Sequence, residues 1–330
     1  MKLSFRFAPA LVVLGISGLA THMAASTFSG TLYYTNFQGG GDNVNKVTYK
    51  YDDTTQMLTL GSAIGITATP GADGIIFAPN GDLLVGGQGT GQVYDVNPTT
   101  GAFTGVAPGS PGADQNSFHL ALDPSGTKFY TSDFMGPLDT IPLPFGTQGS
   151  TKAISGGDSG LTQIAFAPNG NVFYINGSPN GFGNLGTIDL ATGITTRLFS
   201  SVQPAHGLIF DPFTGLMTFF GDGETGTMTQ TGGSLKTSSS LNCDFDQGAV
   251  DGLGHALVAG CNGITFIDYS KSMDITHPGK VIVTGGFNNI DDVAPLVGSG
   301  SGGQTPEPAS VILVGTALLG LIWKRRAAHR

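Results

Sequence analysis

Six side chains that could bind a ligand or a metal recur at one place in a repeated pattern. Each stands at or next to the start of a short apolar segment, and the six are Asp73, His119, Gln163, His206, Asp246 and Asp292. Carboxylate oxygens and imidazole nitrogens are common ligands of divalent cations and common general acids and bases. If the apolar segments lie side by side, these groups form one polar site. The pattern fits calcium or another divalent cation but requires no cofactor.

Recognisable catalytic motifs are missing from the chain. The sequence has no Gly-x-Ser-x-Gly elbow, no His-Glu-x-x-His pair and no Walker loop. Polar residues are also expected at any wet channel mouth without a function. We therefore assign no catalytic residue and leave the metal unspecified. An enzyme, a ligand-binding protein and a structural or interaction protein stay open, and the last of these is favoured.

The elements that would position these side chains form a repeat with a period near 44 residues. Each unit reads as an apolar strand, a turn, a second apolar strand and a glycine pair, as in DGIIFAPNGDLLVGG from Asp73 and QIAFAPNGNVFYING from Gln163. The turn prolines at 79, 124, 168 and 212 are spaced 45, 44 and 44 residues apart. Two weaker strands follow each hairpin. Four short strands at such a period predict the blade of a β-propeller.

The two ends of the repeat region complement one another. Residues 291–298 resemble a first strand without a second, and residues 30–36 resemble a second strand without a first. Joined, they make a sixth blade and remove the exposed strand edges. The predicted fold is therefore an all-β, six-bladed propeller over residues 27–298. Five or seven blades, an open β-solenoid and stacked sandwiches are the alternatives.

The order of a strong hairpin followed by a weaker outer pair resembles the NHL and SMP-30-like propellers. The resemblance implies that the first strand of each blade lines a central channel, so that the six polar side chains gather at its mouth. SMP-30-like lactonases hold calcium with Glu, Asn and Asp at these positions. This chain has no Glu at an aligned position and no matching Asn, so a lactonase- or lyase-like activity is only the alternative function.

Composition supports a loop-rich β protein and excludes one class of partner. The chain has 53 glycines, and Glu224 is the only glutamate between residues 27 and 305, where the other 21 acids are aspartates. Aspartate and glycine favour turns, whereas glutamate favours helices. The same segment has 8 basic against 22 acidic residues, a net charge of −14. Such a surface repels phosphate backbones, so nucleic-acid binding is not expected.

The two cysteines, Cys243 and Cys261, are predicted to form a disulfide. They fall on opposite sides of a hairpin whose turn lies near residues 251–254. Disulfides persist in exported proteins. The bridge would close a loop of 19 residues, which the loop-entropy relation values at about 3 kcal/mol.

The N-terminus indicates export. Lys2 and Arg6 precede an apolar stretch at residues 8–20, and small residues follow at Ala24 and Ala25. This is the pattern of a secretory signal peptide, which we place at residues 1–25.

The C-terminus carries a second signal. Pro306, Glu307 and Pro308 precede 15 residues, 309–323, that are mostly apolar, and a basic end that begins at Lys324. At about 1.5 Å per residue this short membrane helix is shorter than the hydrocarbon core, and its basic end favours a cytoplasmic C-terminus. Residues 306–330 resemble the PEP-CTERM sorting signal, which implies processing by an exosortase-type enzyme. Residues 299–305 are predicted to be a Gly/Ser-rich flexible linker.

These observations predict an exported, envelope-sorted propeller with a structural or interaction role at the cell surface or in the extracellular polysaccharide matrix. The expected partners are the export machinery, an exosortase-type enzyme, and polysaccharide or surface proteins. Contact with the inner membrane is expected through the C-terminal tail, at least transiently.

Overall fold

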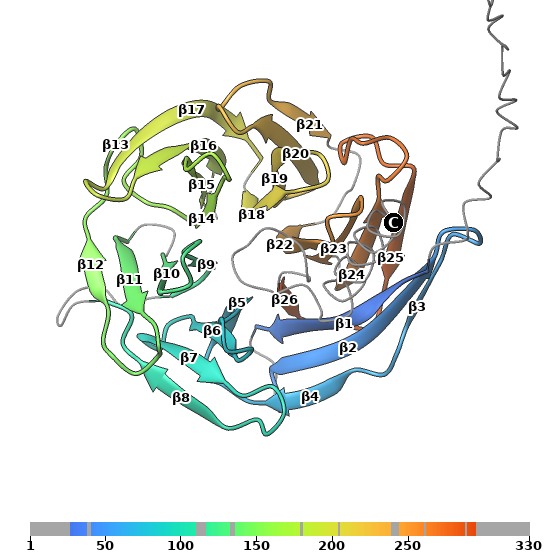
Figure 1. Cartoon of the computed structure of the whole chain (residues 1–330), viewed down its shortest axis with the longest axis horizontal. Helices are drawn as coiled ribbons and strands as arrows, with labels where there is room; N and C mark the ends of the chain where they lie inside the picture. The colour runs from blue at the N-terminus through green and yellow to red at the C-terminus, as the bar shows by residue number, and fades with distance from the viewer. Residues whose placement is uncertain are drawn as a thin grey trace, which may run out of the picture.

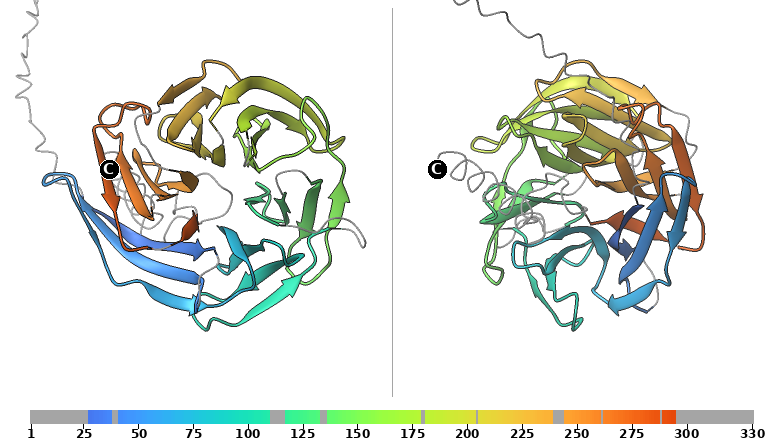
Figure 2. Two further views of the ribbon diagram at one scale, coloured as in Figure 1. Left: turned by 180° about the vertical axis from the view of Figure 1, so that it is seen from behind. Right: turned by 45° about the vertical axis from the view of Figure 1, so that its right-hand side comes forward.

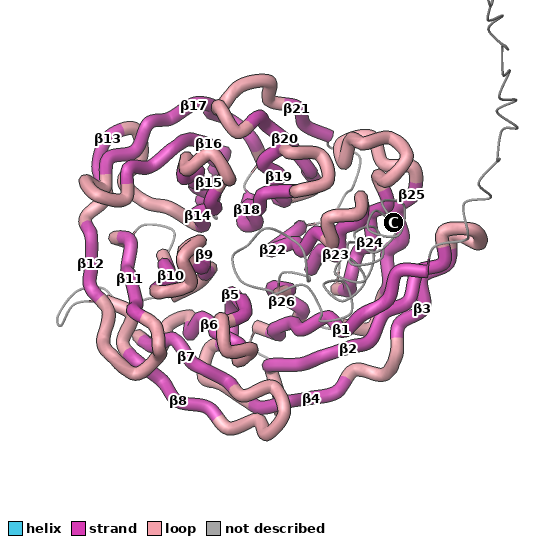
Figure 3. The backbone as a smooth tube through the Cα atoms, in the orientation of Figure 1, coloured by secondary structure: helices cyan, strands magenta, loops and turns pink. Residues whose placement is uncertain are grey.

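The computed structural model describes residues 27–294, apart from 38–40, 110–116, 133–135, 179–180, 204, 239–243, 261 and 288. These residues form strands and loops, as Figure 3 shows. No helix among them is long and apolar enough to cross a membrane. The predicted signal peptide, linker and sorting tail lie outside the described residues.

The described strands form six sheets arranged in a ring around a central axis (Figure 1). The view from behind and the oblique view in Figure 2 show the same closed ring, with each sheet running outward from the axis. The prediction of an all-β, six-bladed propeller is confirmed.

Five blades are built from consecutive segments of the chain. In four of them the innermost strand comes first, whereas in the third blade a short outer strand precedes the innermost one. In four of them all neighbouring strands are antiparallel, and in the third blade a short fifth strand, β13, runs parallel to β17. The first blade consists of β5 (Ala72–Phe77), β6 (Leu83–Gly87), β7 (Gln92–Val96) and β8 (Phe103–Val106), and the second of β9 (Leu120–Leu122), β10 (Lys128–Thr131), β11 (Leu138–Pro142) and β12 (Ser150–Lys152). The third consists of β13 (Ser155–Gly156), β14 (Gln163–Phe166), β15 (Val172–Ser178), β16 (Gly181–Asp189) and β17 (Ile194–Val202). The fourth consists of β18 (Ala205–Asp211), β19 (Leu216–Gly221), β20 (Glu224–Thr229) and β21 (Lys236–Ser238), and the fifth of β22 (Phe245–Val250), β23 (His255–Gly260), β24 (Gly263–Asp268) and β25 (Lys280–Thr284).

The sixth blade joins the two ends of the described chain. Its innermost strand is β26 (Ile290–Val293), which pairs antiparallel with β1 (Thr27–Asn36). Outward from β1 lie β2 (Val44–Asp52) and then β3 (Met57–Leu60) and β4 (Ile64–Thr67), which both pair with β2. A C-terminal strand therefore completes a sheet whose other strands are N-terminal.

The core lies between the blades rather than inside any one of them. Buried apolar side chains form six clusters, and each cluster joins two neighbouring blades. One example packs Leu32 and Tyr51 of the closing blade against Leu257 and Phe266 of the fifth. Burying one large apolar side chain stabilises a fold by about 1.5–3 kcal/mol. Ring closure thus stabilises every blade through both of its neighbours.

The predicted disulfide stays a prediction, because Cys243 and Cys261 lie outside the described residues. The residues beside them are described, and Phe245 of β22 pairs with Gly260 of β23. We expect mass spectrometry of non-reduced peptides to find the two cysteines linked. Replacing both by serine should lower the free energy of unfolding by about 3 kcal/mol. Two free thiols in the exported protein would contradict this pairing.

Candidate metal centre

Five of the six innermost strands bring predicted polar side chains to one end of the channel. Asp73 lies on β5, His119 directly precedes β9, and His206 lies on β18. Asp246 and Asp292 lie on β22 and β26. Neighbouring innermost strands contact each other around the ring, so residues far apart in the sequence become neighbours here.

Glycines placed directly after two of these residues allow the strands to approach closely. A Cβ on Gly74 would collide with the backbone of Phe118 and would lie 2.7 Å from the Cα of His119. A Cβ on Gly207 would lie 2.8 Å from the carbonyl oxygen of Asp246. Real Cβ atoms do not tolerate such distances, so only glycine lets Asp73 approach His119 and His206 approach Asp246 in this way.

Asp73, His119 and Asp292 form the centre of the site. One ligand-capable atom of each lies within 4.8 Å of the other two, and all three residues are buried, with exposed fractions of 5%, 4% and 0%. His119 Nδ1 lies 3.0 Å from Asp292 Oδ2, yet neither atom has an aligned hydrogen-bond partner among the described residues. Buried polar atoms are nearly always paired. These two atoms form an ion pair that lacks an aligned hydrogen bond, so a cation held by both residues could take the place of the histidine's proton.

Asp292 is held in place by its neighbours on two other strands. The backbone N–H of Gln247 on β22 donates to Asp292 Oδ1 at 2.7 Å. The backbone N–H of Asp292 donates to Thr35 Oγ1 on β1 at 3.2 Å, and that hydroxyl contacts the Asp292 carbonyl oxygen at 3.4 Å. The carboxylate is thus positioned before any ligand arrives, which lowers the cost of binding.

A second acid–imidazole pair lies beside this triad. His206 Nδ1 is 2.7 Å from Asp246 Oδ1, and the His206 ring centroid lies 5.9 Å from that of His119. Both residues of this pair are about one-fifth exposed, so the pair is more accessible to solvent than the triad. A carboxylate bonded to one ring nitrogen orients the imidazole and raises its basicity.

Burial and negative charge shift the pKa values of the acidic groups upward. Burial, reinforced by the charges of Asp292 and Asp246, raises the pKa of Asp73 to about 7 against the opposing effect of His119. Burial raises the pKa of Asp246, and burial together with Asp73 and Asp292 raises the pKa of Asp291 well above its ordinary value. Burial is the largest cause of each increase, and the charges of the neighbouring aspartates add to it.

The pKa of the His119 imidazole is shifted by burial and by the same carboxylates. Burial alone would lower its pKa, but the charge of Asp292 and its contact, with a further contribution from Asp73, raise it to about 9. In the absence of a metal, His119 is therefore the cation that the buried carboxylates hold. A divalent metal would replace that proton and carry more charge.

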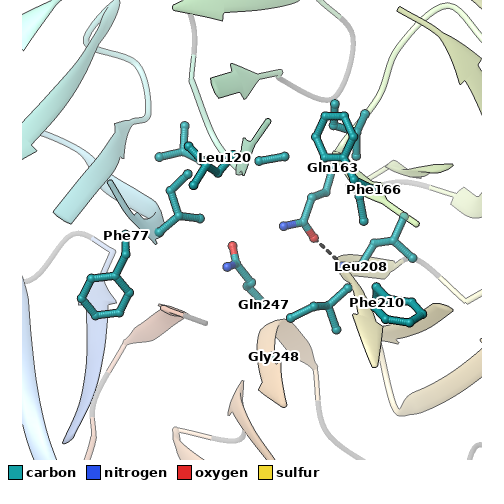
Figure 4. A pocket seen from close by; sticks show the side chains of 14 residues that line it. Phe77, Leu120, Gln163, Phe166, Leu208, Phe210, Gln247 and Gly248 are labelled. Carbon is teal, nitrogen blue, oxygen red and sulfur yellow. Dashed lines mark hydrogen bonds between the residues drawn. The ribbon is translucent and has the colours of Figure 1, made fainter. Parts of the chain in front are cut away.

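Gln163 does not join the triad. Its Oε1 accepts a hydrogen bond from the backbone N–H of Leu208, and its side chain lines a chamber farther along the channel (Figure 4). Gln247, Asp291 and Thr35 contribute to the site but are not among the six residues selected from the sequence. Gln247 could have been selected from the sequence, because QGAV in the fifth repeat aligns with QIAF, which begins at Gln163, in the third.

Comparison with protein-family models matches residues 304–326 to the PEP-CTERM protein-sorting motif. The chain carries a PEP-CTERM sorting motif. This motif implies that the protein is exported and sorted to the envelope, with a C-terminal membrane-anchor tail. The motif is associated with exosortase processing, so the exosortase-type partner predicted from the sequence is supported.

No curated protein matches the chain. Among solved structures, a TolB-like protein from Agrobacterium tumefaciens is similar with a TM-score of 0.51 and 13% identity, over 78% of this chain and 88% of that one. A calcium-binding protein, regucalcin, from Agrobacterium tumefaciens strain C58 gives a TM-score of 0.48 and 16% identity, over 69% of this chain and 75% of that one. The first of these similarities supports the propeller fold and nothing further.

Proposed function

We propose that this PEP-CTERM protein is an envelope-sorted propeller that binds a divalent transition metal at the mouth of its central channel. The observation that carries the proposal is the buried triad of Asp73, His119 and Asp292, whose facing nitrogen and oxygen atoms have no aligned partner. Burying these two groups costs desolvation free energy, which their ion pair without an aligned hydrogen bond offsets only in part. A bound cation would remove that cost and would also reduce the repulsion among the neighbouring aspartates.

The ligand set favours a transition metal over calcium. Calcium takes six to eight oxygen ligands and does not select imidazole. One imidazole and two carboxylates suit zinc, manganese or iron(II). Three protein ligands also leave coordination positions for water or for a donor atom of a bound molecule. The site would therefore present a metal to molecules that enter the mouth.

Metal analysis and calorimetry test the proposal directly. We expect the purified protein to bind one equivalent of zinc or manganese, and His119→Gln to reduce the affinity at least about 100-fold, because it removes a ligand. The matched control is His277→Gln, since His277 is 78% exposed and lies away from the mouth. Equal affinities of His119→Gln and the parent protein would overturn the metal site.

The pH dependence of the metal effect is a second expected result. Metal must displace protons from His119, whose pKa is raised to about 9, and from Asp73, whose pKa is raised to about 7. Affinity should therefore increase as pH rises through this window. Without metal, raised pKa values stabilise the fold at low pH. The contribution of Asp73 is lost as pH rises through about 7, and that of His119 as pH rises through about 9.

Thermal denaturation with and without zinc tests whether metal affinity increases with pH. The zinc-induced increase in the melting temperature should be larger near pH 8 than near pH 6. Under the same conditions the His119→Gln variant should show a much smaller increase at both pH values. A larger zinc effect at the lower pH would contradict the assignment of the ligands.

Hydrolysis is a second candidate function, and the His206–Asp246 pair is the observation that favours it. An imidazole oriented by a carboxylate, next to a metal that carries water, is a common arrangement for general-base catalysis. We would test a panel of small esters and lactones with the metal-loaded protein. Activity that is lost in His206→Gln while metal affinity is kept would support it, and no turnover with either protein would leave a binding role alone.

The proposal also includes where the protein acts in the cell envelope. The sorting motif and the acidic propeller favour display at the cell surface or within the extracellular polysaccharide matrix, after passage through the export machinery. Polysaccharide or other surface proteins would be the partners there. Cell fractionation with an antibody to the propeller would test this, and retention of all the protein in the cytoplasm would overturn it.

A further inference from the structure

A separate chamber lies in the channel beyond the polar mouth. It is partly enclosed, has a volume of about 50 Å³, and is lined by five of the six innermost strands. Its wall residues follow the mouth residues along the same strands, as Ile76 follows Asp73 and Leu208 follows His206. Ile76, Leu120, Ile164 and Leu208 make most of an aliphatic wall, and none of the described residues that line the chamber is charged.

Two glutamines provide the polar side chains of this wall. The Nε2 group of Gln247 donates to the carbonyl oxygens of Ile75 and Val293, both at 3.2 Å, which fixes the orientation of the amide. Its Oε1 atom is therefore turned the other way, and this buried atom has no hydrogen-bond partner among the described residues. The side chain is only 3% exposed. A buried amide oxygen left in this state requires an explanation.

The amide of Gln163 is oriented the opposite way, with its oxygen bonded to the protein and its N–H group left for the chamber. Its Oε1 accepts the backbone N–H of Leu208, so its Nε2 group is directed away from β18. Figure 4 shows the amide ends of Gln163 and Gln247 both pointing into the middle of the chamber. The chamber therefore presents one amide N–H and one amide oxygen on an otherwise apolar wall.

We propose that this chamber binds a small neutral molecule that has an aliphatic body and a hydroxyl group. The hydroxyl can donate to Gln247 Oε1 and accept from Gln163 Nε2, while the aliphatic part contacts the Ile and Leu side chains. The absence of charge in the described wall excludes an ion as the preferred occupant. The size excludes a large ligand, because an engineered apolar cavity of about 150 Å³ binds benzene.

Ordered water is the competing occupant, and the wall disfavours it. A buried water molecule needs roughly two to four polar partners. The chamber offers two such groups on side chains, the fewest that a buried water needs, and the remaining side chains of the described wall are apolar. An alcohol uses the same two groups and also replaces apolar contacts that water cannot make. This inference does not rest on the metal site, because no triad residue lines the chamber.

Methyl NMR of the purified protein, labelled at isoleucine and leucine, tests the proposal. Methanol and ethanol are the probes, and dimethyl ether, the isomer of ethanol that cannot donate a hydrogen bond, is the control. We expect saturable shifts at Ile76, Leu120, Ile164 and Leu208, with the ether binding about threefold to tenfold weaker than ethanol. Shifts that never saturate, or that occur elsewhere, would overturn the proposal.

Two variants distinguish the contribution of the hydrogen bond to Gln247 from that of the free volume of the chamber. Gln247→Met removes the acceptor and should make the alcohol and the ether bind equally. Ile164→Phe fills the chamber and should remove the saturable shifts, while zinc binding at the mouth is kept. If either variant fails to fold, a crystal of the parent protein soaked in ethanol decides between the two occupants. Density for ordered water alone in the chamber would refute alcohol binding.

Discussion

Replacing Asp292 by alanine should abolish metal binding at the channel mouth and lower the free energy of unfolding by about 3–5 kcal/mol. Two losses produce this effect. Asp292 is fully buried and lies 3.0 Å from His119, so its removal leaves a buried imidazolium without its main counter-charge. The backbone N–H of Gln247 also loses its acceptor at 2.7 Å. Chemical denaturation and calorimetry with zinc would measure both effects.

Two further variants separate charge from shape and from general effects of mutation. Asp292→Asn keeps an oxygen that can accept from Gln247 but removes the charge, so it should lose zinc binding and lose less stability than alanine. Asp222→Ala changes an exposed aspartate in the turn between β19 and β20 and should alter neither property. If Asp292→Ala binds zinc with unchanged affinity, the triad is not the metal site.

Much of the fold was predictable because the blades of a propeller produce a repeat in the sequence. The turn prolines at 79, 124, 168 and 212 mark the hairpins that separate the first and second strands of four blades. Each blade has the same local requirements, so the same apolar and turn residues recur. The complementary ends could also be matched, since a first strand near residue 292 and a second strand near residue 32 each lacked a partner.

The site was only partly predictable, because the repeat gives positions along each strand and not distances across the channel. Asp73, His119 and Asp292 come together because β5, the start of β9 and β26 are close, and the glycine after Asp73 permits a short approach. Gln163 has the same position in its repeat, yet its amide binds the backbone of Leu208 and turns toward the chamber. Local hydrogen bonds decide such orientations, and a sequence pattern does not contain them.

The buried role of Gln247 illustrates the same limit. Asp246 and Gln247 both stood near the start of the fifth repeat, and Asp246 was the residue selected. In the structure Asp246 bonds to His206, whereas Gln247 links three innermost strands through Asp292, Ile75 and Val293. Which of two adjacent residues points along the channel depends on the β-bulge between Phe245 and Gly248. Such an irregularity has no reliable mark in one sequence.

Ending the chain at Asn289 should prevent the ring from closing and should leave a protein that aggregates or unfolds without a cooperative transition. The truncation removes β26, whose Val293 and Ile290 are buried and whose backbone pairs with β1. Each of these apolar side chains contributes about 1.5–3 kcal/mol. The loss is comparable to the total stability of a typical domain. Strand β1 would also present unpaired N–H and C=O groups to other chains.

A chain that ends at Gly303 is the matched control, since it keeps β26 and loses only the end of the predicted linker and the sorting tail. It should be monomeric in size-exclusion chromatography and should melt cooperatively. Because Asp292 also leaves with β26, the shorter chain should bind no zinc even in any soluble fraction, whereas the longer one should bind one equivalent. Equal solubility and equal melting temperatures for the two chains would show that β26 does not hold the ring closed, since neither the paired backbone of β1 nor the buried Val293 would then contribute to stability.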